Sequence, residues 1–139
     1  MARRRKIFSD ADASQRNHEA YVAGLFHYEN GNYNNAKSLF KEAIEYWPED
    51  ADAWMALGNC YDVLHKPLKA EASFRKALAV CARAESDNIL YNLGNSLYDQ
   101  AKYEEAIETY LQISKGHRIG PKAQLNLNRA KKKRDKNET

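Results

Sequence analysis

The sequence has little glycine, proline or cysteine, and it lacks long apolar runs. Its 139 residues include only 6 glycines, 3 prolines and 2 cysteines. Such low glycine and proline contents argue against a turn-rich β-sandwich and against a disordered linker. No stretch approaches the roughly 20 apolar residues that a membrane-spanning helix needs. The mean hydropathy of −0.81 and the 29% of charged residues instead indicate one charge-rich helical domain.

The chain also lacks a zinc-binding cysteine set and a secretory signal. Cys60 and Cys81 are too few for the usual structural zinc site, and no further ligand stands at a suitable spacing beside them. Residues 3–6 are basic, but no apolar segment follows them as it does in a secretory signal. We therefore predict two buried thiols, no metal or cofactor, and a cytoplasmic location, with an intracellular organelle as the alternative.

Motifs of familiar catalytic chemistry are missing as well. There is no Gly-rich phosphate loop, no metalloprotease histidine pair and no nucleophile turn around a serine. The four histidines stand at spacings that suit no metal site, and we interpret His27 as a packed, hydrogen-bonded side chain. The sequence therefore predicts that the chain is not an enzyme and takes no small-molecule substrate.

Charge is distributed unevenly along the chain. Lysines and arginines outnumber acidic residues by 3 in residues 1–16 and by 5 in residues 121–139. Acidic residues exceed basic ones by 4 in residues 17–50 and by 2 in residues 87–120, while residues 51–86 carry a net charge of +1. The basic charge thus lies at the two ends, and the middle is near neutral or acidic.

A pattern of small and large apolar residues recurs through the middle of the chain. Its clearest copy consists of Trp54, Leu57, Gly58, Tyr61, Ala70 and Phe74. Moving back by 34 residues, or forward by 36, places similar residues in the same slots: Gly24, Ala36 and Phe40 in one copy, and Leu93, Gly94, Ala106 and Tyr110 in the other. This pattern is similar to the signature of the 34-residue tetratricopeptide repeat.

The resemblance to the tetratricopeptide repeat family implies a fold. We expect an all-α, right-handed α-solenoid of three antiparallel helix hairpins. The expected copies are residues 17–50, 51–86 and 87–120. The second copy has 2 extra residues near Glu85, which we place in the turn after its second helix. Residues 1–16 form a basic segment that is either partly disordered or an extension of the first helix.

Physical reasons account for the recurring residue types. A glycine inside a helix costs about 1 kcal/mol relative to alanine, which is tolerable where it lets the partner helix approach closely. Alanines on the second helix have the matching role, and the large aromatic residues are expected to fill the space between hairpins. Turn signals fall at residues 29–32 and 66–67, with a weaker one at residues 100–102.

A seventh helix is expected to cap the array, because stacked hairpins leave the last one with an exposed apolar face. Pro121 stands at a favourable first-turn position, and Leu125, Leu127 and Ala130 are candidates to cover the third hairpin. The basic side of the helix would face water. We expect the helix to fray from Asp135 to the end.

The resemblance also implies a concave groove lined by the first helix of each hairpin. Family members hold ligands at recurring positions of this helix. Carried over to this sequence, the expected groove residues are Tyr21, Leu25, Tyr28, Met55, Asn59, Asp62, Tyr91, Asn92, Asn95, Tyr98, Leu125 and Arg129. The first-copy end is apolar and suits a buried anchor side chain, while the asparagines are expected to hydrogen-bond an extended peptide backbone.

Chaperone-binding members of the family offer a specific comparison. They grip a C-terminal carboxylate with three cationic side chains and two asparagines. The corresponding positions here hold Tyr21, Leu25, Ala56, Asn88 and Asn92. All three cations are missing, so a co-chaperone role is only an alternative.

The function that these observations favour is an adaptor that binds a peptide or helix of a partner protein, for assembly or scaffolding of a complex. The convex face is the alternative binding surface. The basic residues 3–6 and 131–134 offer a second hypothesis, an accessory factor on nucleic acid, although solvated termini explain them more simply. A third is a self-assembling scaffold, since an incompletely capped array can stack into a homo-oligomer.

Overall fold

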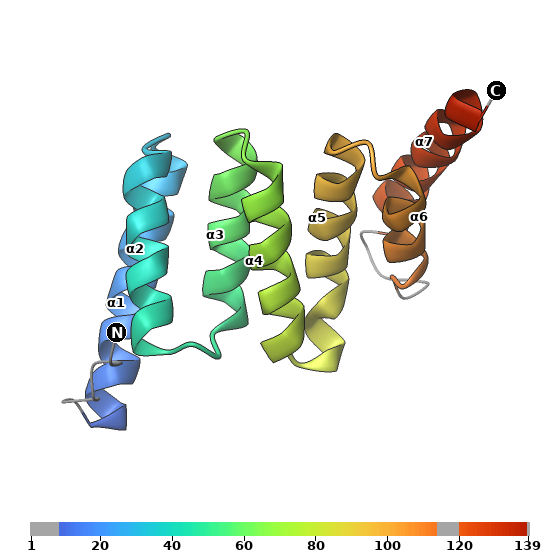
Figure 1. Cartoon of the computed structure of the whole chain (residues 1–139). Helices are drawn as coiled ribbons and strands as arrows, with labels where there is room; N and C mark the ends of the chain where they lie inside the picture. The colour runs from blue at the N-terminus through green and yellow to red at the C-terminus, as the bar shows by residue number, and fades with distance from the viewer. Residues whose placement is uncertain (1–8, 114–119, 139) are drawn as a thin grey trace, which may run out of the picture.

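The computed structural model describes residues 9–113 and 120–138 (Figure 1). Within these ranges the chain forms seven α-helices, one short 3-10 helix (η1) and no strand. The elements are α1 (Asp10–Glu29), α2 (Tyr33–Tyr46), α3 (Ala51–Val63), α4 (Pro67–Val80), η1 (Arg83–Glu85), α5 (Ser86–Asp99), α6 (Tyr103–Leu111) and α7 (Gly120–Glu138).

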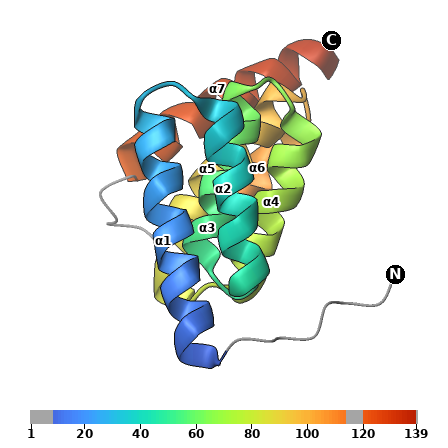
Figure 2. The ribbon, with the colours of Figure 1, turned by 90° about the vertical axis from the view of Figure 1, so that its left-hand side faces the viewer.

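Consecutive helices pack side by side as hairpins, α1 with α2, α3 with α4 and α5 with α6 (Figure 1). Neighbouring hairpins contact each other, and α7 packs against α6 and α5. Seen from the end, α1 and α2 stand in two layers, with the later hairpins stacked behind them (Figure 2). The predicted all-α solenoid of three hairpins with a seventh, capping helix is confirmed.

Local sequence explains where several helices begin. The Ser9 side chain accepts a hydrogen bond from the Asp12 backbone N–H at 3.2 Å and caps α1. Asp50 caps α3 in the same way, through the Ala53 N–H at 3.1 Å. Pro67 begins α4, where its missing N–H costs no helical hydrogen bond. Residues 10–16 of the basic N-terminal segment therefore continue the first helix, and the rest of that segment, apart from Ser9, lies outside the described residues.

Each repeat glycine lies directly under an aromatic ring of its own hairpin. A Cβ atom added to Gly58 would stand 2.5 Å from a ring carbon of Phe74, a distance that no real packing allows. The same contact recurs between Gly24 and Phe40, and between Gly94 and Tyr110. The rings were expected between hairpins. Instead, each ring packs against the glycine of its own hairpin and leaves no room there for a Cβ atom.

One continuous core joins the hairpins to α7. Ala36, Ala70 and Ala106 are fully buried, as their role beside the partner helix requires. On α7, Leu127 and Ala130 are buried, but the Leu125 side chain is 51% exposed. The expectation that Leu125 covers the third hairpin is therefore wrong, because it lies on another side of α7 from these two.

Two further expectations about the chain need correction. The last helix does not fray at Asp135 but continues to Glu138, and the nearby Arg134 forms ion pairs with Glu104 and Asp135. The thiol of Cys60 is buried as predicted, whereas that of Cys81 is only half-buried at the end of α4. The 2 extra residues of the second copy fall where they were expected, since η1 occupies the turn after α4.

All three hairpin turns have the same backbone geometry. Gly31, His65 and Ala101 occupy equivalent positions with positive φ angles of 78°, 58° and 59°. In each turn this residue donates its N–H to the carbonyl three residues back, and the next residue donates to the carbonyl five residues back. These are the two bonds of a Schellman cap, which satisfies the last carbonyls of the first helix. The turn signals in the sequence thus mark the right places, although glycine fills the strained position only once.

We expect Ala70→Leu to lower the free energy of unfolding by about 1–3 kcal/mol, because Ala70 has no exposed surface and a larger side chain overfills the helix interface. The matched control is Ala72→Leu, at an exposed position of the same helix, with an effect within about 0.5 kcal/mol. Thermal melts measure both. Equal melting temperatures for the two variants would contradict this packing.

The hairpin turns yield two predictions with opposite effects on stability. Ala101→Gly should raise the free energy of unfolding by about 0.5–1 kcal/mol, because it relieves a left-handed backbone conformation that disfavours a Cβ atom. Gly31→Ala, at the equivalent position, should lower it by about 1 kcal/mol. Chemical denaturation of both variants tests the pair, and changes of the same sign would refute the proposed strain.

Candidate functional site

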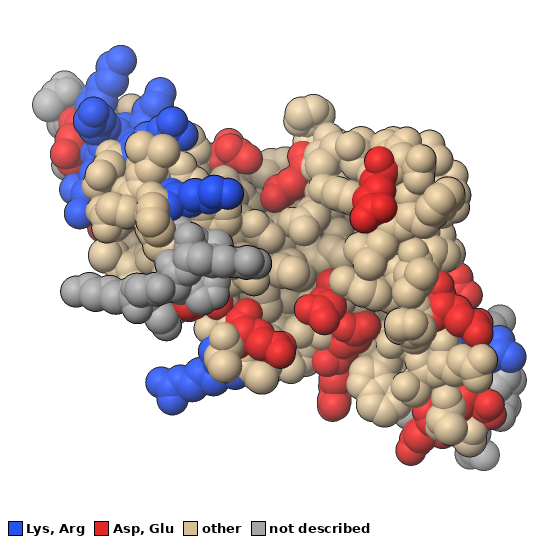
Figure 3. Space-filling view, turned by 180° about the vertical axis from the view of Figure 1, so that it is seen from behind, with Lys and Arg blue, Asp and Glu red and all other residues tan. Residues whose placement is uncertain are grey.

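The twelve residues predicted to line the groove come from α1, α3, α5 and α7, the helices nearest the viewer in Figure 3. None of the twelve is buried. Ten are half-buried, and the two on α7, Leu125 and Arg129, are exposed. The surface is hollowed between the two ends of the molecule on this face (Figure 3). The solenoid therefore brings together, on one accessible face, positions that are far apart in the sequence.

The first-copy end of the groove is apolar and aromatic. Tyr21, Leu25 and Tyr28 of α1 and Met55 of α3 pack against the core while keeping part of their surface exposed. Neighbouring rings hold two of the tyrosines in place. The ring centroid of Tyr21 is 5.8 Å from that of Phe40, and the centroid of Tyr28 is 5.2 Å from that of Tyr33. A surface fixed in this way loses little entropy on binding.

Burial raises the pKa of Tyr21 and of Tyr28, and nearby carboxylates add to the effect. Both phenol groups consequently stay protonated at neutral pH. Each can donate a hydrogen bond as well as offer an apolar ring, which is the combination that makes tyrosine common at protein interfaces.

The asparagines of the groove bind one another across repeats. Asn92 donates to the Asn59 side-chain oxygen at 3.3 Å. The Asn95 oxygen accepts from Tyr110 at 2.5 Å and from Asn126 of α7 at 2.9 Å. Asn95 thus ties α5 to α6 and α7, and a peptide backbone would compete with these bonds. The amide nitrogen of Asn59 and the amide oxygen of Asn92 take no part in this shared bond.

A row of carboxylates borders the groove, and only Asp62 was among the predicted residues. Asp52 lies in the first turn of the same helix, and Asp99 ends α5. Burial raises the pKa of all three. No ion pair within the described residues involves any of them. Asp99 was missed because it stands 37 residues from Asp62, and only the stacking of α5 on α3 brings the two together.

Asp62 shows the largest effect among these carboxylates. Burial in the groove raises its pKa to about 6, and the charge of Asp99 acts in the same direction. The hydroxyl of Ser96 partly offsets the rise. The ionised carboxylate therefore lowers the stability of the folded chain.

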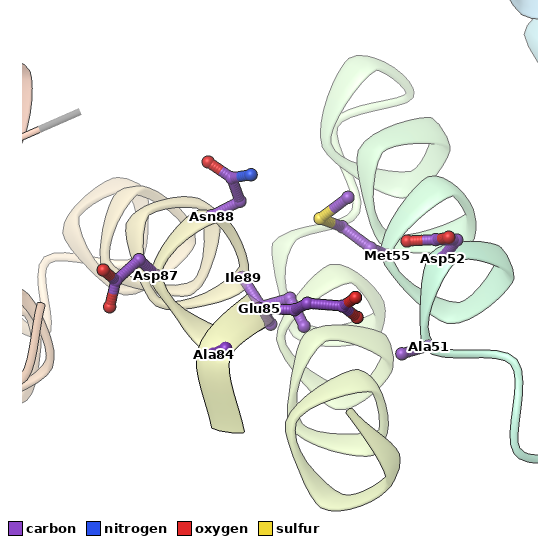
Figure 4. A pocket seen from close by; sticks show the side chains of 8 residues that line it. All are labelled: Ala51, Asp52, Met55, Ala84, Glu85, Asp87, Asn88 and Ile89. Carbon is purple, nitrogen blue, oxygen red and sulfur yellow. The ribbon is translucent and has the colours of Figure 1, made fainter. Parts of the chain in front are cut away.

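A cavity of about 290 Å³ opens at the base of the groove between α3 and α5 (Figure 4). Met55 and Ile89 supply apolar lining, and Asp52 and Glu85 supply carboxylates. The Glu85 side chain extends toward Ala51 and Asp52, whereas Asp87 points away on the far side of α5 (Figure 4). Glu85 ends η1, so the 2 extra residues of the second copy help to build this acidic wall.

Two absences apply to the described residues alone. They contain no group of three or more histidine, cysteine, aspartate or glutamate side chains placed to hold a metal ion. None of their helices combines the length and the apolar character that crossing a membrane demands.

Comparison with protein families identifies the repeat. A tetratricopeptide repeat model matches residues 21–88, and a second one matches residues 87–115. The chain belongs to the tetratricopeptide repeat family. The two matches together contain all the repeat glycines and aromatic residues that the sequence pattern singled out.

Among known tetratricopeptide proteins, the chain is similar to the type IV pilus assembly protein PilF of Pseudomonas aeruginosa. The two are 37% identical over 97 residues, which cover 69% of this chain and 38% of PilF. The chain thus spans well under half the length of that relative. A solved structure of Pseudomonas aeruginosa PilF matches with a TM-score of 0.77 at 28% identity, covering 90% of this chain and 56% of that one.

Two further solved structures contain bound peptides. The first tetratricopeptide domain of Spaghetti (RPAP3), bound to an HSP90 peptide, matches with a TM-score of 0.79 at 18% identity, covering 86% of this chain and 93% of that one. The Yersinia enterocolitica secretion chaperone SycD, in complex with a peptide of the translocator YopD, matches with a TM-score of 0.78 at 16% identity, covering 94% and 99%. At such identities the likeness shows a shared fold.

The raised pKa of Asp62 yields a prediction about stability and pH. In the unfolded chain the carboxyl has a pKa near 3.9. Between about pH 4 and pH 6 the folded state therefore binds the proton more tightly, and the stabilisation that protonation gives is lost as the pH rises through this window. Asp62→Asn should raise the free energy of unfolding at pH 7 by about 1 kcal/mol, after allowing for solvent screening.

Chemical denaturation at pH 7 and at pH 4 checks this expectation. The gain from Asp62→Asn should be clear at pH 7 and small at pH 4, where the wild-type carboxyl is largely protonated. Glu42→Gln on the exposed side of α2 is the control and should change little at either pH. A loss of stability in Asp62→Asn at pH 7 would show that the carboxylate is stabilising.

Proposed function

We propose that this chain is an adaptor that holds a peptide or helix of a partner protein in the groove formed by α1, α3, α5 and α7, during the assembly of a larger complex. The observation that carries the proposal is the apolar end of the groove. There Leu25 and Met55, with two tyrosines, keep exposed surface although they pack on the core. A partner side chain buried on this surface would contribute roughly 1.5–3 kcal/mol before ordering costs.

The relatives support the same class of function. RPAP3 and SycD hold peptides on the same fold, and PilF is named for assembly of the type IV pilus. Family members of this kind bind proteins without catalysis, in keeping with the lack of catalytic motifs in the sequence. We expect a micromolar dissociation constant, because a flexible peptide must be ordered as it binds.

A co-chaperone role has little support in the groove. The positions of the three expected cations are occupied by uncharged residues, and carboxylates lie nearby at Asp52 and Asp62. An acidic C-terminal peptide would meet like charges there, and like-charge contacts are a means of rejecting wrong partners. The groove therefore favours a different class of peptide from the HSP90 tail that RPAP3 binds.

Nucleic-acid binding and self-assembly stay as predictions with less support. Part of the basic C-terminal helix serves the fold, since Arg134 lies 3.3 Å from Glu104 of α6. Gel-shift titration and light scattering against concentration are the measurements for the two ideas. The cytoplasmic location also stays a prediction, supported by two cysteines that are not bonded to each other.

The test of the adaptor is a double substitution, Leu25→Glu with Met55→Glu. Two half-buried apolar side chains would become charged at the proposed anchor, so partner capture from lysate should be lost. The control is Leu68→Glu with Leu111→Glu, which adds the same charge at exposed positions of α4 and α6. Circular dichroism establishes that both variants fold. If the groove variant captures the same partners as the wild type, the groove assignment is wrong.

A further inference from the structure

The central groove helices α3 and α5 differ sharply in charge from the rest of the molecule. The chain has 22 lysines and arginines, yet α3 and α5 contain none of them. On α1 the single one is Arg16, whose guanidinium lies 5.8 Å from the centre of the Tyr46 ring of α2. Cationic residues gather instead on α7, at one end of the molecule (Figure 3). The centre of the groove is therefore bordered by carboxylates, with no cation from α3 or α5 and only Arg16 from α1.

These carboxylates stand at both ends of the apolar surface. Asp52 and Asp62 are ten residues apart on α3, or about 15 Å along the helix. Met55 lies between them, and Asp99 joins Asp62 from α5. Acidic side chains lie above and below the uncharged centre of this face in Figure 3. A segment lying along α3 would meet a carboxylate, then an apolar surface, then carboxylates again.

The cavity at the base suits one long basic side chain. Lysine and arginine carry an aliphatic stem that packs on apolar surface and a charged head that needs polar partners. The stem fits the lining from Met55 and Ile89, and the head would reach Asp52 and Glu85. A cavity with this mixed lining offers nothing comparable to an acidic or a purely apolar side chain.

Resting on the adaptor function proposed above, we propose that the partner segment is basic and amphipathic, with apolar side chains on the surface formed by Leu25 and Met55 and lysine or arginine side chains on the carboxylates of α3 and α5. Charge complementarity favours this partner. The half-buried Asp62 and the exposed Asp52 and Asp99 form no ion pair within the described residues, and they become paired when such a segment binds. Pairing also removes the cost that each ionised carboxylate imposes on the free protein.

The test is a selection of binding peptides from a random-sequence phage-displayed library, with the full chain as target. Enriched peptides should combine lysine or arginine with large apolar residues. A synthetic copy of the best peptide should lose at least tenfold in affinity when glutamate replaces its basic residues. Raising NaCl from about 0.05 to 0.5 M should also weaken its binding, as screening requires.

Substitutions on the protein localise the effect. Asp62→Asn with Asp99→Asn should weaken binding of the selected peptide about tenfold, as expected for losing charge-assisted contacts. Glu42→Gln with Glu45→Gln is the control, since it removes the same charge from exposed positions of α2 and should leave the affinity within twofold. Fluorescence anisotropy with the labelled peptide measures both.

The outcomes separate this inference from the proposed function. Enriched peptides that are neutral or acidic, and that the Leu25→Glu and Met55→Glu variant no longer binds, would retain the groove and overturn the basic partner. Peptides that bind this variant as well as the wild type, or no enriched peptide at all, would overturn the adaptor groove and this inference with it. Sedimentation that shows self-association, lost in Asp62→Asn with Asp99→Asn, would make the basic α7 of a second copy the occupant and overturn a separate partner.

Discussion

The contact of an aromatic ring with a glycine inside each hairpin is the constraint on which the fold depends. Phe40 and Phe74 are fully buried, and each ring occupies the volume that a Cβ atom would need on the facing helix. This contact sets how closely the two helices of a hairpin approach. The small alanines beside it extend the same close packing to the next hairpin, and the core becomes continuous up to α7.

From this spacing follows the geometry of the groove. Because α3 and α5 stack in register, side chains 33 residues apart, such as Asn59 and Asn92, come within hydrogen-bond distance. The same stacking brings Asp62 and Asp99 together, although like charges repel. The packed hairpins thus supply the stability, and the ionised Asp62 reduces it slightly.

Much of the fold could be predicted because its signals are local. The glycine at position 58 and the aromatic residue at position 74 recur in step, and Asn30 with Gly31 marks a turn. The left-handed backbone at His65 and Ala101 could not be predicted from residue type, since neither favours it. Only the hairpin geometry imposes it there.

The position of the groove could be predicted from the sequence, but the polar groups that it leaves available could not. Family positions locate the helices that line it, yet they do not say which polar groups are already used by the scaffold. Asn95 is an example, because its oxygen serves Tyr110 and Asn126 in the folded chain. The sequence also did not show which side of α7 faces the core, because this helix lies outside the repeat pattern. Leu125 is therefore exposed while Leu127 is buried.

Within the described residues, the cations concentrated on α7 lie apart from the carboxylates of α3 and α5, so charges of opposite sign are separated in space. A charged body approaching from solution experiences a torque in such a field before any contact forms. Within the Debye length, about 10 Å at 0.1 M salt, an approaching cation is drawn toward α3 and α5 and an anion toward α7. The orientation of a first encounter is thus biased by where this chain keeps its lysines and arginines.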